Sequence, residues 1–172
     1  MTAPTEPTAS ASSRWAPTGV LRSAADVETV ELGPNRVAFP LSGEETGGRY
    51  SLTAFTMAPP PAPGPPPHLH EDADEAIYVV AGTVEMALGE RRLTGTPGAV
   101  MLVPRGTLHA LANPGPEPAR MLIILSPPGY EGFWREMAAL RAQLGEPPDA
   151  ETVRALQRKH HLATGEAPRR FE

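Results

Sequence analysis

The sequence predicts an all-β fold of antiparallel strands, followed by two C-terminal α-helices. Between residues 27 and 126, short apolar or alternating runs are separated by turn residues, at intervals typical of a sandwich or barrel. The 22 prolines and 16 glycines, spread between these runs, favour many turns over long helices. After residue 130 the apolar residues recur with a helical period instead. With 172 residues, the chain has room for one domain with a core.

Eight strands are expected in succession between residues 27 and 125. Each predicted strand is a short run rich in Val, Ile, Leu, Phe or Thr and is followed by turn residues. The runs are VETVEL (27–32), RVAFPL (36–41), YSLTAFTM (50–57), AIYVVAG (76–82), TVEMAL (83–88), AVMLVP (99–104), LHALAN (108–113) and RMLIIL (120–125).

The two helices come last. The apolar positions of EGFWREMAALRAQL (131–144) share one helical face: Phe133, Met137, Leu140 and Leu144. GEPP ends this helix, and Asp149 is placed to cap a second one in DAETVRALQRKH (149–160), with Val153 and Leu156 facing inward. The first helix either covers the mouth of a barrel or packs on the outside of a sheet, and the pattern fits both arrangements.

Composition excludes several classes of protein. A net charge of −5, with no Lys/Arg cluster, argues against nucleic acid and membrane surfaces as partners. The absence of cysteine excludes disulfides, thiolate metal sites and cysteine nucleophiles, and it fits the cytoplasmic localisation that we expect. There is no apolar secretory signal and no apolar run long enough to span a bilayer. Residues 1–24 are rich in Ala, Ser, Thr and Pro and are expected to be a disordered tail, in which Trp15 is the exception.

Candidate metal ligands gather in PPPHLHEDADEAIYVVAG (residues 65–82). Alternate side chains of an extended segment share a face, so His68 and His70 are expected to point into the same space. Glu75 begins the next predicted strand, and His109 begins a later one. A lone HxH is weak evidence, but the three preceding prolines would hold the chain extended into His68. Three neutral imidazoles and one carboxylate suit one divalent first-row metal, whether Fe, Mn, Ni, Co, Cu or Zn.

These residues resemble the two sequence motifs of the cupin superfamily. His68, His70, Glu75 and Gly82 have the spacing of the first motif, although only three residues, where five are usual, precede His68 after Gly64. GAVMLVPRGTLHALAN (98–113) resembles the second motif and ends on Asn113. The resemblance covers roughly residues 27–126. It implies a cupin jelly-roll β-barrel over residues 25–128 with the metal inside, and a C-terminal helical extension over residues 129–172.

The resemblance also implies a pocket beside the metal. Alternate residues of a strand share a face, so Ile77 and Val79 are expected on the same inward face as Glu75. For the same reason Leu111 is expected on the inward face of His109. Three further inward positions are assigned without a known register: Phe55, Met101 and Ile123. Because these side chains are uncharged, we expect a small, flat, apolar or aromatic substrate. Glu71 and Asp72 are expected to be solvated loop charges, and Asp74 to point away from Glu75.

The chain looks most similar to single-domain cupins such as quercetinase-type dioxygenases. That resemblance implies an oxygenase in which dioxygen is the second substrate and Glu75 is both a ligand and the general base. The metal would lower the pKa of the substrate hydroxyl. Two alternatives stay open: a non-oxidative cyclase, isomerase or dehydratase with the same ligands, and a non-catalytic binding or sensor protein. Many cupins pair through their outer sheets, so a homodimer is expected by family analogy.

Overall fold

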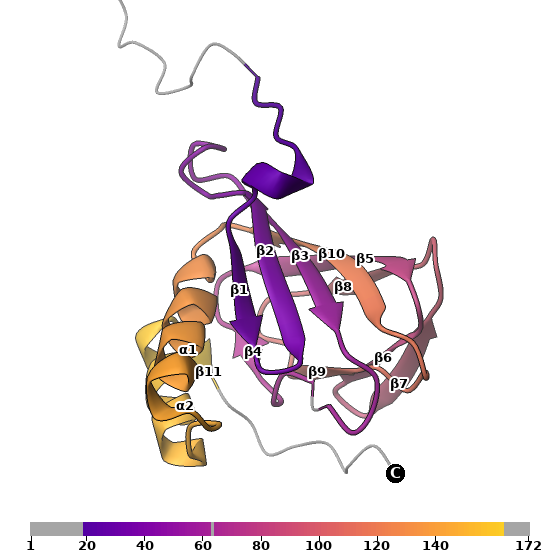
Figure 1. Cartoon of the computed structure of the whole chain (residues 1–172). Coiled ribbons are helices and arrows are strands. Elements are labelled where there is room, and N and C mark those ends of the chain that lie inside the picture. The colour runs from indigo at the N-terminus through magenta and orange to yellow at the C-terminus, as the bar shows by residue number, and fades with distance from the viewer. Residues whose placement is uncertain (1–18, 63, 164–172) are drawn as a thin grey trace, which may run out of the picture.

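The computed structural model describes residues 19–62 and 64–163, which form β-sheets followed by two helices (Figure 1). A short 3₁₀ helix, Ala24–Asp26, precedes the first strand. The strands are β1 Thr29–Leu32, β2 Asn35–Leu41, β3 Ser51–Met57, β4 Leu69–His70, β5 Asp74–Ala81, β6 Val84–Leu88, β7 Arg91–Gly95, β8 Val100–Val103, β9 His109–Ala112, β10 Ala119–Ser126 and β11 Leu162–Ala163. The helices are α1 Glu131–Leu144 and α2 Ala150–Lys159.

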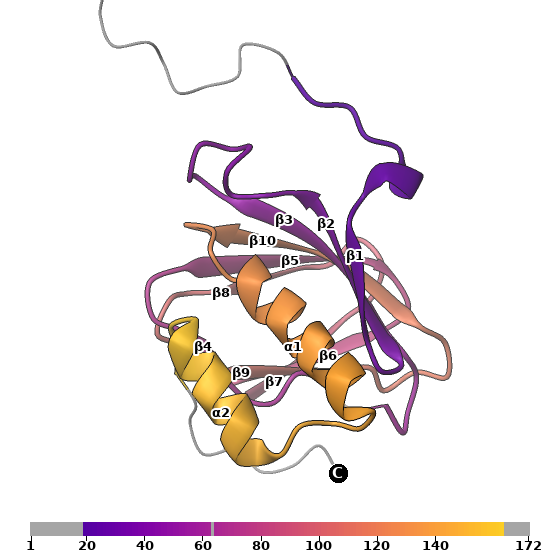
Figure 2. The same cartoon turned by 60° about the vertical axis from the view of Figure 1, so that its left-hand side comes forward.

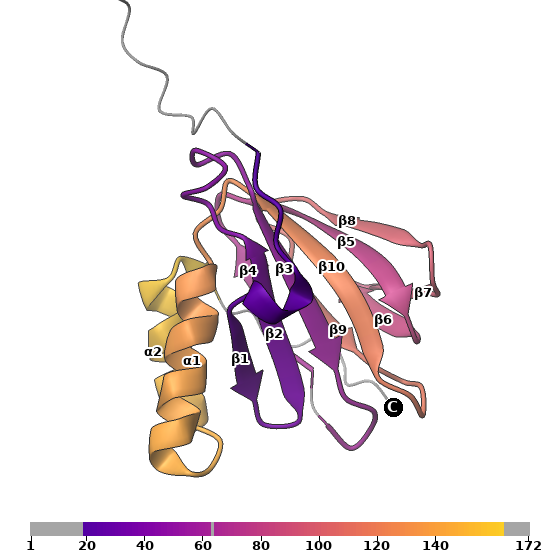
Figure 3. The same cartoon turned by 45° about the horizontal axis from the view of Figure 1, so that its top comes forward.

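The strands are arranged in three antiparallel sheets, consistent with the predicted jelly roll. The large sheet has the order β1-β2-β3-β10-β5-β8, and a smaller sheet has the order β7-β6-β9. Strand β4 pairs with β11 in a third, two-stranded sheet. Figure 3 shows the large sheet passing over the smaller one. The predicted all-β class with two C-terminal helices is therefore confirmed.

The core lies on the inner face of the large sheet. Burial alternates strictly along β3, as expected for a strand with one face inward. The register places Met121 of β10 beside Phe55 of β3, and Ile77 of β5 between Ile123 of β10 and Met101 of β8. All five of these side chains are buried, so cross-strand apolar pairs hold the strands in this register.

The predicted strands and helices correspond closely to the observed ones, with three additions. Strands β4, β7 and β11 were not expected, because LH and LA are too short to show a period and RRLTG carries two exposed arginines. Strand β7 forms all the same, because it pairs along its whole length with β6. Tertiary pairing has therefore supplied strands that local pattern does not indicate.

Helix α1 begins and ends where the sequence predicts but buries less of its apolar face than expected. Phe133 and Met137 are buried, whereas Leu144 is 50% exposed. The helix ends at Gly145, whose φ of 74° is left-handed and whose N–H donates to Arg141 O. The N-terminal half of α1 is therefore the part that packs on the sheets.

Helix α2 is capped as predicted, since the side chain of Asp149 accepts a hydrogen bond from Thr152 N. Val153 and Leu156 are half-buried against the core, and the fully buried side chain is a polar one, Gln157. Figure 2 shows α1 and α2 lying side by side across one end of the sheets. The described part of the chain contains no helix long and apolar enough to cross a membrane.

The expected disordered tail, including Trp15, falls mostly on residues 1–18, and the end of the expected extension falls on residues 164–172. Both stretches lie outside the described residues. Within the described residues, the extension does more than add two helices, because β11 returns to pair with β4. Its Leu162 lies opposite His70, so the end of the extension is fixed to a strand that carries a candidate ligand.

Candidate metal centre

The backbone brings His68, His70 and His109 together although about forty residues separate the last from the first two. His68 and His109 form an isolated antiparallel bridge, with His68 N donating to His109 O at 3.0 Å and His109 N donating to His68 O at 2.9 Å. The turn before β9 is also tied to β4, because Gly106 N donates to His70 O at 2.7 Å. Gly106 has φ +72°, which explains why glycine stands there.

Gly64 fits closely beside the strand that carries His109. A Cβ built on Gly64 would lie 1.9 Å from Leu111 O, which no side chain could tolerate. At the far end of β9, the Asn113 side chain donates to Met57 O and Glu117 O and accepts from Gly115 N. These contacts give Asn113 a structural role, because its side chain holds three backbone groups in place at this end of β9.

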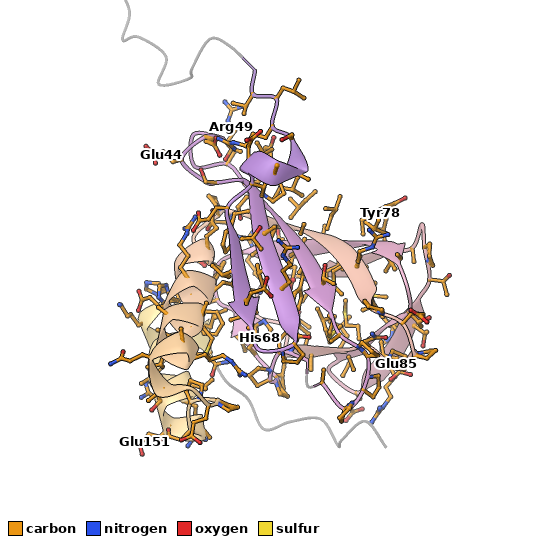
Figure 4. All side chains as sticks on the ribbon, viewed as in Figure 1. Glu44, Arg49, His68, Tyr78, Glu85 and Glu151 are labelled. Carbon is orange, nitrogen blue, oxygen red and sulfur yellow. The ribbon has the colours of Figure 1, made fainter. Side chains whose placement is uncertain are left out.

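The three imidazoles converge in the interior. Their candidate ligand atoms all lie within 4.8 Å of one another, and the three residues are buried. In Figure 4, His68 lies inside the fold, whereas Tyr78 points outward from β5. Glu75, at the start of β5, joins the cluster: its Oε2 lies 2.9 Å from His109 Nε2 and 3.4 Å from His70 Nε2.

Hydrogen bonds to the Nδ1 atoms of His68 and His109 set the tautomers of these two rings. His68 Nδ1 lies 2.9 Å from Pro66 O, and His109 Nδ1 lies 3.0 Å from Thr107 O. Since a carbonyl only accepts, each Nδ1 carries the proton and each Nε2 presents a lone pair. In the neutral form of His109, Nε2 therefore cannot donate to Glu75 Oε2, and two acceptor atoms face each other unless Nε2 carries a proton or a metal ion.

This pair of facing acceptors is a direct indication of a cation site. His109 Nε2 and Glu75 Oε2 are buried without a hydrogen-bond partner among the described residues, and so is His70 Nδ1. Buried acceptors that face each other cost free energy unless a positive charge lies between them. Three imidazoles and a carboxylate are a suitable donor set for a divalent first-row metal, so the residues present fit such an ion.

The electrostatics of the cluster agree with this assignment. Burial, with help from the neighbouring imidazoles, lowers the pKa of His68 to about 3, which keeps this ring neutral as a ligand must be. Burial alone would raise the pKa of Glu75, but the adjacent His109 and His70 outweigh it and hold that pKa below its usual range. Burial lowers and Glu75 raises the pKa of His109, with a net rise, so without a metal ion this ring favours a proton, which a bound metal would displace. The carboxylate is therefore ionised and draws positive charge into the site.

A small apolar cavity lies beside the cluster. Its volume of about 30 Å³ leaves room for little more than water-sized groups. The residues lining it are Thr53, Phe55, Pro65, Pro66, His68, His70, Glu75, Leu111, Ile123, Leu125, Tyr130, Phe133, Trp134, Gln157 and Leu162.

The six expected pocket residues divide into two groups. Phe55, Leu111 and Ile123 line the cavity, but Ile77, Val79 and Met101 do not. Ile77, Val79 and Met101 do face inward as expected, since all three are buried. They lie elsewhere in the core, as Gly95 of β7 shows: a Cβ built on it would lie 2.2 Å from Met101 Cε and 3.1 Å from Val79 Cγ2. Alternation along a strand therefore tells which side of the sheet a residue faces, but not how far the residue lies from the candidate metal ligands.

The sequence did not indicate the part of the cavity wall that comes after residue 128. Tyr130, Phe133, Trp134, Gln157 and Leu162 all belong to the C-terminal extension. The structure thus places α1 over the cavity, which the sequence left open. Only one signal could have pointed to Gln157: it lies four residues after Val153, on the face already expected to turn inward.

Two of the acidic residues near the ligands have partners. Asp72, expected to be a solvated charge, accepts a hydrogen bond from Tyr130 Oη at 2.9 Å, and Tyr130 packs edge-on against His70. Asp74 points away from Glu75, as expected, and pairs with Arg105 at 2.8 Å. The Asp72 contact links the ligand loop to the start of the helical extension.

A second, larger groove adjoins the cavity. It has a volume of about 580 Å³ and runs between α1, the β1–β2 turn and the prolines before His68. Five residues line both spaces: Phe55, Pro65, Pro66, Phe133 and Trp134. Trp134 packs against Phe55 and Phe133, with ring centroids 5.8 Å and 5.0 Å away. An aromatic partition therefore separates the groove from the metal ligands.

Comparison with known proteins supports the fold. Residues 55–125 match the family model described as a cupin domain. KdgF from a Halomonas species has 19% identity and a TM-score of 0.54, over 64% of this chain and 94% of that chain. The polyketide cyclase RemF from Streptomyces resistomycificus has 23% identity and a TM-score of 0.53, over 63% and 80%. A predicted oxalate decarboxylase from Thermotoga maritima has 18% identity and a TM-score of 0.55, over 63% and 99%.

At these identities the solved structures show the fold and not the reaction. The search of curated proteins found no match. The matched domain contains the two motifs, the three clustered histidines and Glu75. Residues 55–125 therefore match a cupin domain, and the described part of the chain has the cupin fold.

Proposed function

We propose that this protein is a metal-dependent enzyme, and specifically a dioxygenase that acts on a small, enolisable aromatic or polyketide-like molecule. The observation that carries the proposal is that three buried imidazoles and the Glu75 carboxylate meet beside an apolar cavity, with several of their polar atoms lacking a hydrogen-bond partner among the described residues. His68, His70, Glu75 and His109 would hold the metal. When bound, the ion would supply a Lewis acid and a meeting point for substrate and dioxygen.

Glu75 is the proposed general base. Its carboxylate lines the cavity and is held in its ionised form by the adjacent imidazoles. A carboxylate within hydrogen-bond reach of an acidic substrate hydroxyl can take its proton and hold it during the reaction. The apolar walls around it exclude water, which strengthens each electrostatic contact in the cavity.

The size of the cavity narrows the substrate class. The space beside the ligands is too small for an aromatic ring system, whereas the adjoining groove has the volume of an ordinary ligand pocket. We infer that the polar head of the substrate enters the cavity and that its apolar body occupies the groove. Phe133 and Trp134 lie where these two parts of the substrate would meet.

Metal analysis followed by oxygen uptake tests this function. We expect about one divalent metal per chain and oxygen consumption with flavonols or other enolisable aromatics. The Glu75→Gln variant would keep the three histidines but lose the base, so turnover should fall by about 100-fold or more while some metal is retained. Metal-loaded protein that consumes no oxygen across the screen would reject the dioxygenase assignment.

A non-oxidative reaction is the second candidate. An ionised Glu75 in an apolar cavity can also catalyse a cyclisation, isomerisation or dehydration, because proton transfer needs no dioxygen. Product formation by the metal-loaded protein without dioxygen would favour this reaction. A binding or sensor protein would instead retain its ligand affinity in Glu75→Gln and show no turnover with any substrate.

We also propose that the chain forms a homodimer through the outer face of the large sheet. Five large apolar side chains are exposed on neighbouring strands there: Tyr78, Val80, Val100, Leu102 and Ile124. Tyr78 lies opposite Val100, and Ala76 lies between Leu102 and Ile124, so the patch is continuous across β8, β5 and β10. A continuous exposed apolar patch is typical of an interaction surface.

A further inference from the structure

A polar side chain of the extension faces the proposed metal site without any partner. Gln157 is 2% exposed and lines the cavity with His68, His70 and Glu75. Within residues 19–62 and 64–163, its side-chain amide makes no hydrogen bond. The amide atoms are not among the side-chain atoms that are sealed from solvent without a partner, so they remain accessible to a molecule in the cavity.

The position of Gln157 is well fixed. Helix α2 is capped by Asp149 at its start, and the chain after its end pairs with the strand that carries His70. Leu162, which lies opposite His70, follows Gln157 by only five residues. The amide is therefore held against the ligand cluster from both ends of α2, as a contact to a bound molecule requires.

The surroundings indicate what Gln157 would bind. The Glu75 carboxylate is an acceptor and would take the proton of an acidic substrate, which leaves an anionic oxygen in the cavity. Apart from the Thr53 hydroxyl, the walls beyond the candidate ligands are mainly aromatic and aliphatic and cannot stabilise that charge. An amide N–H can do so by donating a hydrogen bond, and hydrogen bonds to charged groups are the stronger class.

We propose that the side-chain amide of Gln157 binds the substrate, donating a hydrogen bond to its enolate, phenolate or carboxylate oxygen beside the histidine cluster. This inference rests on the proposed function, because it requires an open position next to the metal. It adds a substrate-binding residue that lies outside the matched cupin domain, residues 55–125.

Azide binding to the Co(II)-loaded protein tests the proposal, since azide is a small anion that fits the cavity and changes the visible spectrum of cobalt. In Gln157→Met, which keeps the length of the side chain, the azide dissociation constant should rise about ten-fold. Gln157→Glu should bind azide more weakly still, because it places a carboxylate where the anion binds. The control is Gln143→Met, the same change at an exposed position of α1, which should bind as the wild type does.

A second measurement separates contact from a structural role. In ¹⁵N-labelled, Zn(II)-loaded protein, the side-chain amide signal of Gln157, identified by its loss in Gln157→Met, should move when azide is added. Wild-type dissociation constants in both Gln157 variants, or an unmoved amide signal, would overturn the proposal while leaving the proposed function intact. Wild-type protein that holds cobalt but binds no azide would refute the open metal position, and with it both proposals.

Discussion

The cupin domain and the C-terminal extension contribute different things to the same cavity. Residues 55–125 supply every candidate metal ligand, on backbone that reciprocal hydrogen bonds and closely fitted glycines hold in place. The described part of the extension, residues 129–163, supplies five lining side chains and no candidate ligand. The difference shows that one stretch of the chain carries the candidate ligands, whereas both stretches shape the cavity beside them.

The largest expected effect comes from removing a ligand in the domain. His109 is fully buried, and its Nε2 faces Glu75 Oε2. In His109→Ala, metal affinity should fall by more than about 100-fold, beyond the loss typical of a residue that only supports a ligand. Metal content after dialysis measures this. The control is His161→Ala, an exposed residue outside the cluster, which should retain the wild-type metal content.

A core substitution in the extension should act on stability and leave the ligands in place. Phe133 is buried against Trp134, so Phe133→Ala should lower the free energy of unfolding by about 3 kcal/mol. Denaturant unfolding measures the loss, and metal content at low temperature should stay unchanged. Leu144→Ala, on the exposed end of the same helix, should cost less than about 0.5 kcal/mol. Equal losses in both variants would show that α1 does not pack as described.

The outer face of the large sheet provides a test that touches neither the ligands nor the extension. Leu102 is 62% exposed in the centre of β8, so Leu102→Glu should weaken the proposed dimer without unfolding the chain. Sedimentation at increasing concentration should show a dimer for the wild type and a monomer for the variant. A wild-type protein that stays monomeric would reject the proposed interface.

The smallest effect is expected at an ion pair remote from the cavity. Arg22 and the backbone of Ser42 bind Glu45 and lower the pKa of its carboxyl to about 2. Because the folded pKa lies below the unfolded value, this contribution to stability is present above about pH 4 and is lost as the pH falls towards 2. Thermal unfolding of Glu45→Gln should therefore show a small deficit at pH 7 that shrinks as the pH falls from about 4 through the folded pKa. A deficit as large at pH 2 as at pH 7 would mean that the charge is not its cause.

The spacing of the histidines pointed to a candidate metal site, and the structure brings the three histidines together. Strand alternation put His68 and His70 on one face, and the family motifs added Glu75 and His109. The same reasoning was less informative about the pocket. It identified Ile77 and Val79 as inward-facing, and they are, but they contribute to the core and not to the cavity wall.

Gln157 shows why the rest could not be predicted. Its place on an inward helical face is visible in the sequence, but a glutamine there is usually a surface residue. Its proximity to His70 depends on β11 crossing to β4, a pairing of two residues that leaves no periodic pattern.

The sequence by itself therefore determined the fold class, the two helices and the set of candidate metal ligands. These features follow from local periodicity, from capping and from fixed spacings. Each of these patterns can be seen in residues that are close together in the sequence. Only the tertiary structure decided which apolar side chains reach the cavity, and that α1 and α2 close it. Those features depend on the distance between elements far apart in the chain, and that distance is set by strand register and by long-range packing.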